Sequence, residues 1–251
     1  MLALILAGGL GTRLGKITER IPKVMVGIKG RPFLEYLIQQ LKIYNIEKII
    51  LCTGHLKEKV KNYFGNGAVF GVNISYSEEN KPFGTGGALK FAQNLVLEND
   101  FIVMNGDSLF AIDLVELMNF HFKKNALATI ALAKAQDSFR YGSVSISKDN
   151  ELQSFVEKEG MLNAHLINGG IYIFNKKILD FIPKGKNISL EKDIFPKLIG
   201  KGFYGFPFDS FFVDIGIPED YEKVRANPKN LLKSIEFKRR NKNVYSSKSP
   251  P

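Results

Sequence analysis

The stretch Leu2–Leu14 reads LALILAGGLGTRL and decides the fold of the chain. Its first part, Leu2 to Ala7, is a continuous apolar run with no polar face, which is typical of a strand buried on both faces of a parallel sheet. The run ends in three glycines, Gly8, Gly9 and Gly11. Because glycine accepts positive φ and leaves backbone N–H groups uncovered, such a loop can form a concave anion site. Arg13 adds a planar cation suited to phosphate oxygens, so the stretch indicates a strand followed by a phosphate-binding loop.

An ordinary junction between a strand and a turn is the competing interpretation of these glycines. It would explain Gly9 or Gly11 alone, but not three glycines followed by Thr12 and Arg13. Two common phosphate motifs are excluded. The chain has no G-x-x-x-x-G-K-[ST] sequence, and the dinucleotide fingerprint fails because Leu14 stands where its third glycine belongs.

The 251 residues are 45% hydrophobic and 24% charged, which is an ordinary globular composition. This length suits one large α/β domain or two small ones. The one cysteine, Cys52, excludes an internal disulfide and a cysteine-based zinc site, and we expect a cytoplasmic protein. No stretch has the pattern of a signal peptide or a membrane span, so a membrane is not an expected partner.

The formal net charge of +10 suits nucleic acid, anionic lipid or phosphorylated small molecules as partners. Much of this charge lies in residues 231–251, and a basic terminal segment is more often solvated than a binding element. We therefore expect one domain at 1–230 and a flexible basic tail at 231–251. Nucleic acid is not an expected partner, because the chain lacks aromatic RNA-binding motifs, a helix-turn-helix and an ordered basic stripe.

Strand and helix patterns alternate along the chain. Apolar runs predict strands at 48–53, 72–76 and 101–105, and helical spacing predicts helices at 32–41, 56–64 and 189–198, the last with Ser189 as its N-cap. This alternation implies right-handed crossovers and an α/β fold with a doubly wound, mostly parallel, Rossmann-like sheet. Further short strands are expected at 127–135, 142–146, 152–156 and 170–174. Their short connections indicate an antiparallel or mixed portion.

Two more features are expected at the carboxyl ends of the strands, where doubly wound sheets bind ligands. A glycine cluster at 82–89 opens a helix expected to run to about Leu97, and the free N–H groups of a helix N-terminus favour anions. Glycines that are needed only for close packing are an equally good interpretation of the same residues. Asp107 follows a buried strand, where a carboxylate holds Mg²⁺ or caps a turn.

The first stretch, together with Pro22-Lys23, resembles the signature of the sugar nucleotidyltransferases, the nucleoside-diphosphate-sugar pyrophosphorylases. Segments that resemble further family motifs follow in the family's order: PFGTGGAL at 82–89, NGD at 105–107, EK at 157–158, NGG at 168–170 and DIGIPEDY at 214–221. The resemblance implies in-line transfer, in which an oxygen of a sugar 1-phosphate attacks the α-phosphorus of a nucleoside triphosphate and pyrophosphate leaves. Independently, the chain offers cations and carboxylates but no recognisable Ser-His-Asp or Cys-His set, which agrees with catalysis by positioning and charge.

The resemblance also implies a role for individual residues. Arg13 would hold the leaving pyrophosphate, Lys23 the reacting phosphates, and Asp107 and Asp214 a Mg²⁺ ion; the catalytic residues are then Arg13, Lys23 and Asp107. The implied nucleotide-binding residues are Leu6, Ala7, Gly8, Gly9, Gly11, Thr12, Arg13, Glu78, Gly84, Thr85, Gly86 and Gly106. The implied sugar-phosphate residues are Gly142, Glu157, Lys158, Asn168 and Gly169, with Lys158 on the phosphate. Glu159 stands where the family usually has proline, which changes the expected shape of that loop.

Shorter runs, such as RYG at 140–142 and FVDIG at 212–216, are most similar to the D-glycero-α-D-manno-heptose 1-phosphate guanylyltransferases within this family. They imply GTP and that heptose 1-phosphate as substrates, and a place in cell-surface polysaccharide biosynthesis. Glu78 and Glu79 precede the second glycine cluster, where relatives contact the base; a carboxylate there suits the two adjacent donors of guanine. Mannose, glucose or glucosamine 1-phosphate with GTP, UTP or dTTP, and a catalytically silent regulatory subunit, stay open as alternatives. The sequence is also compatible with a homo-oligomer.

Overall fold

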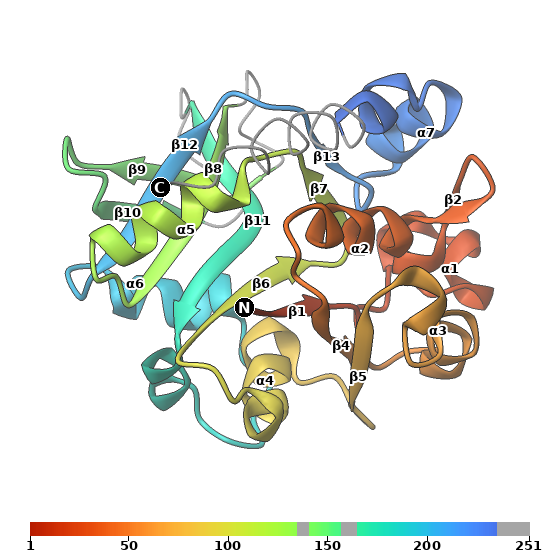
Figure 1. Ribbon diagram of the computed structural model, residues 1–251, viewed down its shortest axis with the longest axis horizontal. Coiled ribbons are helices and arrows are strands. Elements are labelled where there is room, and N and C mark those ends of the chain that lie inside the picture. Colours follow the sequence, from red (N-terminus) through yellow and green to blue (C-terminus); the bar gives the residue numbers. More distant parts are fainter. Residues whose placement is uncertain (135–140, 157–164, 235–251) are drawn as a thin grey trace, which may run out of the picture.

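A computed structural model describes residues 1–134, 141–156 and 165–234 of the chain. Its centre is a nine-stranded sheet, with the earlier strands on one side of the view in Figure 1 and the later strands on the other. The first four strands are β1 (Leu2–Leu6), β4 (Lys48–Thr53), β5 (Asn73–Glu78) and β6 (Asp100–Asn105). They are parallel and stand in the order β5-β4-β1-β6.

The later strands continue the same sheet beyond β6. They are β8 (Ala128–Lys134), β9 (Ser143–Ile146), β10 (Leu152–Val156), β11 (Leu166–Asn175) and β12 (Phe203–Phe208). Strand β11 is antiparallel to both β6 and β8, whereas β12 runs parallel to β8. The β9–β10 pair joins the sheet through one residue pair, Ile167 with Ser143. The doubly wound, mostly parallel sheet with a mixed portion is thereby confirmed.

Helices and short strands complete the described fold. The α-helices are α1 (Lys16–Arg20), α2 (Phe33–Ile43), α3 (Lys57–Phe64), α4 (Gly84–Phe91), α5 (Leu114–Lys123), α6 (Phe195–Leu198) and α7 (Pro218–Ala226). The 3₁₀ helices are η1 (Thr12–Leu14), η2 (Lys23–Met25), η3 (Ala68–Phe70), η4 (Ala92–Leu95) and η5 (Lys176–Phe181), and η6 (Leu190–Ile194) is a π-helix. Two small sheets pair β2 (Gly27–Ile28) with β3 (Arg31–Pro32), and β7 (Ser108–Phe110) with β13 (Phe212–Asp214).

The hydrophobic core has two parts, one on each face of the sheet. Strand β1 contributes alternate residues to both: Ala3 and Ile5 pack with α2 and α3, and Leu2 and Leu4 pack with α4 and α6. All four residues are buried. This is the two-sided burial that the apolar run predicts, and it fixes β1 in the middle of the molecule with its carboxyl end at the first glycine loop.

The helical segment predicted at 189–198 is confirmed in its extent, but it consists of two kinds of helix. Ser189 does cap it, because its hydroxyl oxygen accepts a hydrogen bond from Lys192 N. The first turn is the π-helix η6, and α6 begins only at Phe195. Pro196, in the first turn of α6, has no N–H to continue a hydrogen-bond ladder from the preceding turn.

Two expected boundaries also differ from the structure. The helix after the second glycine cluster ends as α4 at Phe91 and continues only as the 3₁₀ turn η4, short of Leu97. Leu231, which lies in the expected tail, is fully buried and packs in the first core. The packed part of the chain therefore extends past residue 230. Among the described residues, no helix is long and apolar enough to cross a bilayer.

Candidate active site

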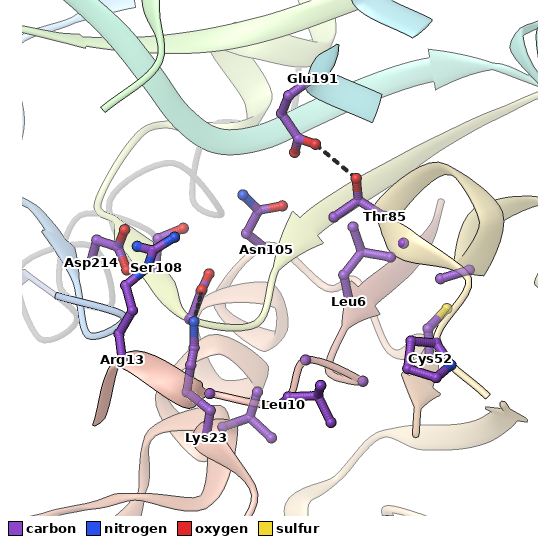
Figure 2. A pocket seen from close by; sticks show the side chains of 18 of the residues that line it. Leu6, Leu10, Arg13, Lys23, Cys52, Thr85, Asn105, Ser108, Glu191 and Asp214 are labelled. Atoms are coloured by element: carbon purple, nitrogen blue, oxygen red, sulfur yellow. Dashed lines mark hydrogen bonds and ion pairs between the residues drawn. The ribbon is translucent and has the colours of Figure 1, made fainter. Parts of the chain in front are cut away.

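A cavity of about 510 Å³ opens where β1, β4 and β6 end. In Figure 2, Arg13 and Asp214 lie on one side of this cavity, Thr85 and Glu191 lie on the opposite side, and Asn105 stands between them. Its wall therefore combines residues from the first glycine loop, the second glycine cluster and β13. Ligand binding beyond the carboxyl ends of parallel strands is the arrangement expected for this fold.

The first glycine loop presents its backbone to the cavity. Within the described part of the chain, no hydrogen bond uses the N–H groups of residues 8–12. Gly11 has φ +69°, and a Cβ at this position would lie 2.7 Å from the Thr18 methyl carbon, so the turn requires glycine. Thr18 holds the turn by donating its hydroxyl to Gly11 O over 2.8 Å. The loop is thus an ordered row of unused donors, as an anion site needs.

The two predicted cations lie beside the two predicted metal carboxylates. Lys23 Nζ forms an ion pair with Asp107 Oδ2, and the Lys23 side chain is only 17% exposed. Arg13 lies beside Asp214 in Figure 2, and its charge acts on that carboxylate. Two cations and two carboxylates therefore lie together beside the unused N–H donors of the loop, at one end of the cavity.

Asp107 and Asp214 come together through long-range pairing. Asp107 lies in the turn between β6 and β7, Asp214 ends β13, and the β7–β13 ladder pairs Ser108 with Asp214. Asp214 Oδ1 accepts a hydrogen bond of 2.7 Å from Gly216 N. Desolvation, followed by the charge of Asp107, raises the pKa of Asp214, and the charges of Lys23 and Arg13 offset this rise only in part.

This pair of carboxylates fits a hard divalent cation. A Cβ at Gly216 would lie 2.8 Å from Asp214 Oδ1 and 3.2 Å from Asp107 Oδ2, so glycine leaves space between the two groups. Among the described residues, no cluster of three or more acidic, histidine or cysteine side chains forms a metal cage. Two carboxylates supplemented by phosphate oxygens and water are a common way of binding Mg²⁺.

At the part of the cavity next to β5, the structure corrects one predicted residue. Glu78 does not line the cavity; it forms ion pairs with Lys57 and Lys61, which lower its pKa. The neighbouring Glu79 lines it instead and is 7% exposed, and its Oε1 has no hydrogen-bond partner among the described residues. Burial raises the pKa of Glu79 to about 7. A side chain at the end of a strand and its successor point to opposite faces, which separates the two glutamates.

The second glycine cluster serves close packing more than anion binding. The carbonyl of Ile188 accepts hydrogen bonds from Gly86 N and Gly87 N, so these two amides at the start of α4 are engaged. A Cβ at Gly84 would lie 2.5 Å from Ile188 O, and one at Gly87 would lie 2.7 Å from Lys186 O. Gly86, which the resemblance implies as a nucleotide-binding residue, thus does not line the cavity, whereas Gly84 and Thr85 do line it.

Thr85 connects the cluster to η6 by a short network. Its hydroxyl donates to Glu191 Oε2 over 2.7 Å and accepts from Leu190 N over 2.8 Å. Ser189 Oγ donates to the same Glu191 oxygen over 2.8 Å. Glu191, which sequence analysis did not select, is thereby fixed with its carboxylate at the cavity wall, and the dashed line in Figure 2 marks the Thr85 contact.

Most of the other predicted residues meet at this cavity. Those that line it are Leu6, Gly8, Gly9, Gly11, Thr12, Arg13, Lys23, Gly84, Thr85, Asp107, Gly142, Asn168 and Asp214. Ala7, Gly106 and Gly169 do not line it. Gly106 packs against β1, where its N–H donates to Leu6 O, and Gly169 packs against Phe110. Glu157 and Lys158 lie outside the described residues.

Four further polar residues of the cavity wall were not among the predicted site residues: Asn105, Ser108, Tyr141 and Glu191. Asn105 and Ser108 flank the selected pair Gly106-Asp107, so adjacency to a motif was the available signal. Tyr141 adjoins Gly142, and its hydroxyl donates to Asp220 over 2.8 Å. Nothing in the local sequence of Glu191 distinguishes it from a solvated helical glutamate.

Comparison with known proteins gives a consistent result. The protein-family model described as "Nucleotidyl transferase" matches residues 2–230. A D-glycero-alpha-D-manno-heptose 1-phosphate guanylyltransferase of Aneurinibacillus thermoaerophilus is 41% identical over 92% of this chain and 100% of the relative. A mannose-1-phosphate guanylyltransferase of Mycobacterium tuberculosis is 34% identical over 90% of this chain and 64% of the relative. The crystal structure of HddC from Yersinia pseudotuberculosis complexed with GMP-PN is 36% identical, with a TM-score of 0.80 over 91% of this chain and 99% of that one.

Proposed function

The chain belongs to the nucleotidyl transferase family, and we propose that it transfers the guanylyl group of GTP to D-glycero-α-D-manno-heptose 1-phosphate, releasing pyrophosphate. The relative from Aneurinibacillus thermoaerophilus, which carries this activity in its name, supports both substrates, because this chain matches it over its whole length at 41% identity. The complex of HddC with GMP-PN supports a guanine nucleotide.

One observation carries the proposal. A single cavity joins a row of unused backbone donors, two cations and two adjacent carboxylates. In the reaction an oxygen of the sugar phosphate attacks the α-phosphorus, and the bond from that phosphorus to the bridging oxygen of pyrophosphate breaks. Both substrates are anions, so catalysis requires alignment and charge neutralisation more than a nucleophilic side chain.

Each charged residue then has a task. The N–H groups of residues 8–12 and Arg13 bind the β- and γ-phosphates and stabilise the charge that develops on the leaving pyrophosphate. Lys23 is the cation beside the α-phosphate, where it leaves Asp107 for the phosphate as substrate binds. Asp107 and Asp214 would hold Mg²⁺, which supplies Lewis-acid stabilisation of the phosphate charge when bound.

Glu79 supports guanine as the base. An ionised carboxylate only accepts hydrogen bonds, and guanine presents two adjacent donors, N1–H and the 2-amino group. Uracil and thymine present N3–H between two carbonyl oxygens, which a carboxylate repels. The unpartnered Glu79 Oε1 lies at the part of the cavity next to β5, and the two guanine donors would stabilise the ionised form of Glu79, whose pKa burial raises in the substrate-free protein.

The deciding experiment is a matrix of GTP, UTP and dTTP against heptose, mannose, glucose and glucosamine 1-phosphates, read out as pyrophosphate release. We expect the highest kcat/KM for GTP with the heptose phosphate. Glu79→Gln should reduce the preference for GTP over UTP by roughly 10²-fold, because the two guanine donors then face a neutral amide. Glu78→Gln is the matched control and should keep the preference. Equal use of UTP by the wild-type protein would contradict the proposal.

Mannose 1-phosphate with GTP is the second candidate, supported by the 34% identity to a mannose-1-phosphate guanylyltransferase. The same matrix separates it from the heptose phosphate. A catalytically silent subunit is disfavoured because Arg13, Lys23, Asp107 and Asp214 are all present and line one cavity.

We place this activity in the cytoplasm, acting on free small molecules. Nucleoside triphosphates are cytoplasmic substrates, and the buried free thiol of Cys52 suits a reducing compartment. Fractionation of cells that express the chain, with activity as the readout, tests the location.

A further inference from the structure

Buried polar atoms without a partner are concentrated at the cavity. Among the described residues, six buried side-chain oxygens have no hydrogen-bond partner, and three of their residues line the cavity: Glu79, Asn105 and Ser108. Leaving a buried polar atom unpaired costs about 1–3 kcal/mol, so such atoms in a binding cavity are candidates for ligand contacts. The proposed function uses Glu79 for the base, which leaves Asn105 Oδ1 and Ser108 Oγ unassigned.

Asn105 and Ser108 lie on either side of the turn that carries Asp107. Asn105 is the last residue of β6, and Ser108 is the first residue of β7. Both face Gly170 of β11, which has φ +71°; a Cβ at Gly170 would clash with Ser108 Oγ and lie 3.2 Å from Asn105 Nδ2. Glycine at this position therefore lets β11 approach close enough to enclose both side chains.

The amide of Asn105 is oriented by β11. Its Nδ2 lies 3.5 Å from the Tyr172 hydroxyl oxygen, which also accepts a hydrogen bond of 2.8 Å from Asn168 Nδ2. Asn168 Oδ1 accepts from Gly170 N over 2.9 Å. Both the Nδ2 and the Oδ1 atom of Asn168, the residue predicted from the sequence to bind the sugar, thus form hydrogen bonds within the chain. Asn105 Oδ1, by contrast, has no hydrogen-bond partner among the described residues, and Figure 2 shows Asn105 in the middle of the cavity.

The chemistry of this acceptor restricts its ligand. Asn105 Oδ1 accepts hydrogen bonds and donates none, so it repels phosphate oxygens, which are also acceptors at neutral pH. It suits a neutral hydroxyl that donates. Ser108 Oγ both donates and accepts, and so complements a hydroxyl in the same place. Asn105 is two residues from Asp107 and contacts the same Tyr172 hydroxyl as Asn168, so it links the residues proposed for the metal to a residue proposed for the sugar.

We propose that Asn105 Oδ1 and Ser108 Oγ form a hydroxyl-recognition subsite for the sugar 1-phosphate, with Asn105 as its main specificity residue and Tyr172 as the residue that positions the Asn105 amide. This inference rests on the proposed function, since it needs a polyhydroxylated acceptor in the cavity. The subsite selects for a hydroxyl at one carbon of the sugar, because a deoxy substrate leaves both buried oxygens unpaired.

The test is a cycle between enzyme variants and substrate analogues, with the full chain. Asn105→Leu removes the amide while keeping a similar volume, and kcat/KM is measured with the parent sugar 1-phosphate and with each of its mono-deoxy analogues. The wild-type protein should reject one analogue by about tenfold to hundredfold. With the parent sugar 1-phosphate, kcat/KM of Asn105→Leu should fall below that of the wild type by a similar factor. With the rejected analogue, kcat/KM of the variant and of the wild type should be equal. GTP affinity, measured by calorimetry without the sugar, should be unchanged.

Controls separate this role from a structural one. Asn119→Leu makes the same substitution on the exposed face of α5, away from the cavity. It should change neither kcat/KM for the sugar 1-phosphate nor the affinity for GTP. Asn105→Ala provides a second variant if Asn105→Leu unfolds, and thermal unfolding of each variant checks its fold. Ser108→Ala should weaken discrimination against the same analogue, and Tyr172→Phe should raise KM for the sugar more than it lowers kcat.

The outcomes distinguish the inference from the proposed function. If the wild-type protein releases pyrophosphate with no sugar 1-phosphate, the proposed function fails and the subsite fails with it. If the wild-type protein is active but Asn105→Leu loses nothing, or loses the same factor with every analogue, the subsite alone is overturned.

Discussion

At the scale of single residues, the cavity holds acidic groups in different electrostatic settings. Lys23 pairs with Asp107, whereas Asp214 has a raised pKa because it is desolvated and faces Asp107. Glu79 has a raised pKa through burial alone, with only a backbone hydrogen bond opposing it. Such groups cost folding free energy in the free protein, and they are stabilised when cations or hydrogen-bond donors of the substrates arrive.

Replacing Asp107 or Asp214 tests whether these two carboxylates hold the metal ion. Asp107→Asn and Asp214→Asn should each lower kcat by about 10²–10³, as removal of a preorganised electrostatic group does elsewhere. The measurement is pyrophosphate release at saturating Mg²⁺. Asp209→Asn is the control, because the Asp209 side chain is 83% exposed and, within the described part of the chain, its ion pair is with Lys134 at the surface. Near wild-type turnover in either cavity variant would contradict the assignment of the metal site.

The raised pKa of Glu79 predicts a pH-dependent effect on stability. The folded protein holds the Glu79 proton up to about pH 7, whereas the ordinary pKa is 4.5, so the wild-type protein loses stability as pH rises through this window. Glu79→Gln removes this loss. A difference of one in pKa corresponds to about 1.36 kcal/mol, so the variant should be more stable than wild type by roughly 3 kcal/mol at pH 8, with little of this gain at pH 4.5.

Urea unfolding of the substrate-free protein at pH 5, 6.5 and 8 measures this effect. Glu78→Gln is the internal control with the opposite sign, because Lys61 and Lys57 lower the pKa of Glu78. Its ion pairs stabilise the fold at neutral pH, so this variant should lose rather than gain stability at pH 8. Parallel pH profiles for wild type and Glu79→Gln would refute the burial of an ionisable Glu79.

At the scale of elements, the contact between α4 and the segment before η6 shapes one wall of the cavity. Ile188 O caps the start of α4, and Ile188 N donates back to Phe83 O over 2.8 Å. The Thr85–Glu191 hydrogen bond continues the same contact into the cavity. Because the glycines of α4 have no Cβ, the carbonyl groups of Lys186 and Ile188 can approach them closely, and two segments about a hundred residues apart form one continuous wall.

Gly87→Ala tests this close approach. In an unconstrained helix the change would stabilise by up to about 1 kcal/mol. Here a new Cβ would lie 2.7 Å from both Lys186 O and Phe83 Cβ, so we expect a net destabilisation of roughly 1–2 kcal/mol from overpacking. Gly27→Ala, where no atom lies within 4 Å of the added Cβ, should change stability by less than about 0.5 kcal/mol. Denaturant unfolding checks both, and a Gly87→Ala protein more stable than wild type would show that the 186–188 segment yields.

At the scale of the whole molecule, one sheet carries both halves of the cavity. Strands β1, β4 and β6 deliver the nucleotide side, and β11, inserted antiparallel next to β6, brings Asn168 to the same place. Helix α7 and the helical residues 229–234, which include Leu231, pack against the first core. The folded unit therefore ends later than its family motifs do.

Two changes near the C-terminus test where the folded unit ends. Deleting residues 235–251 should leave kcat within about twofold, which is small beside the tenfold that 1.4 kcal/mol produces. Leu231→Ala, by contrast, should lower the free energy of unfolding by roughly 2–4 kcal/mol, because Leu231 is fully buried. Pyrophosphate release and urea unfolding measure the two effects. A large loss of turnover in the folded 1–234 protein would show that the deleted residues contribute to the site.

The sequence by itself determined the strands, the first glycine loop and the identity of the charged residues. These features depend on near neighbours along the chain: an apolar run without a polar face requires burial on both sides, and Gly11 requires a residue that tolerates positive φ. The family motifs placed Arg13, Lys23, Asp107 and Asp214 correctly at one cavity. The strand at 48–53 was predicted to the residue.

Only the tertiary structure decided which side chains meet. The choice of Glu79 over Glu78 depends on the face of β5 that the lysines of α3 cover. The role of Gly86 and Gly87 depends on the carbonyl of Ile188, about a hundred residues away. The Asn105 subsite exists because the register of β6 against β11 sets Tyr172 beside Val103 and brings Gly170 onto the turn after β6. Such contacts arise from register and packing between distant segments, and local sequence patterns carry no information about that register.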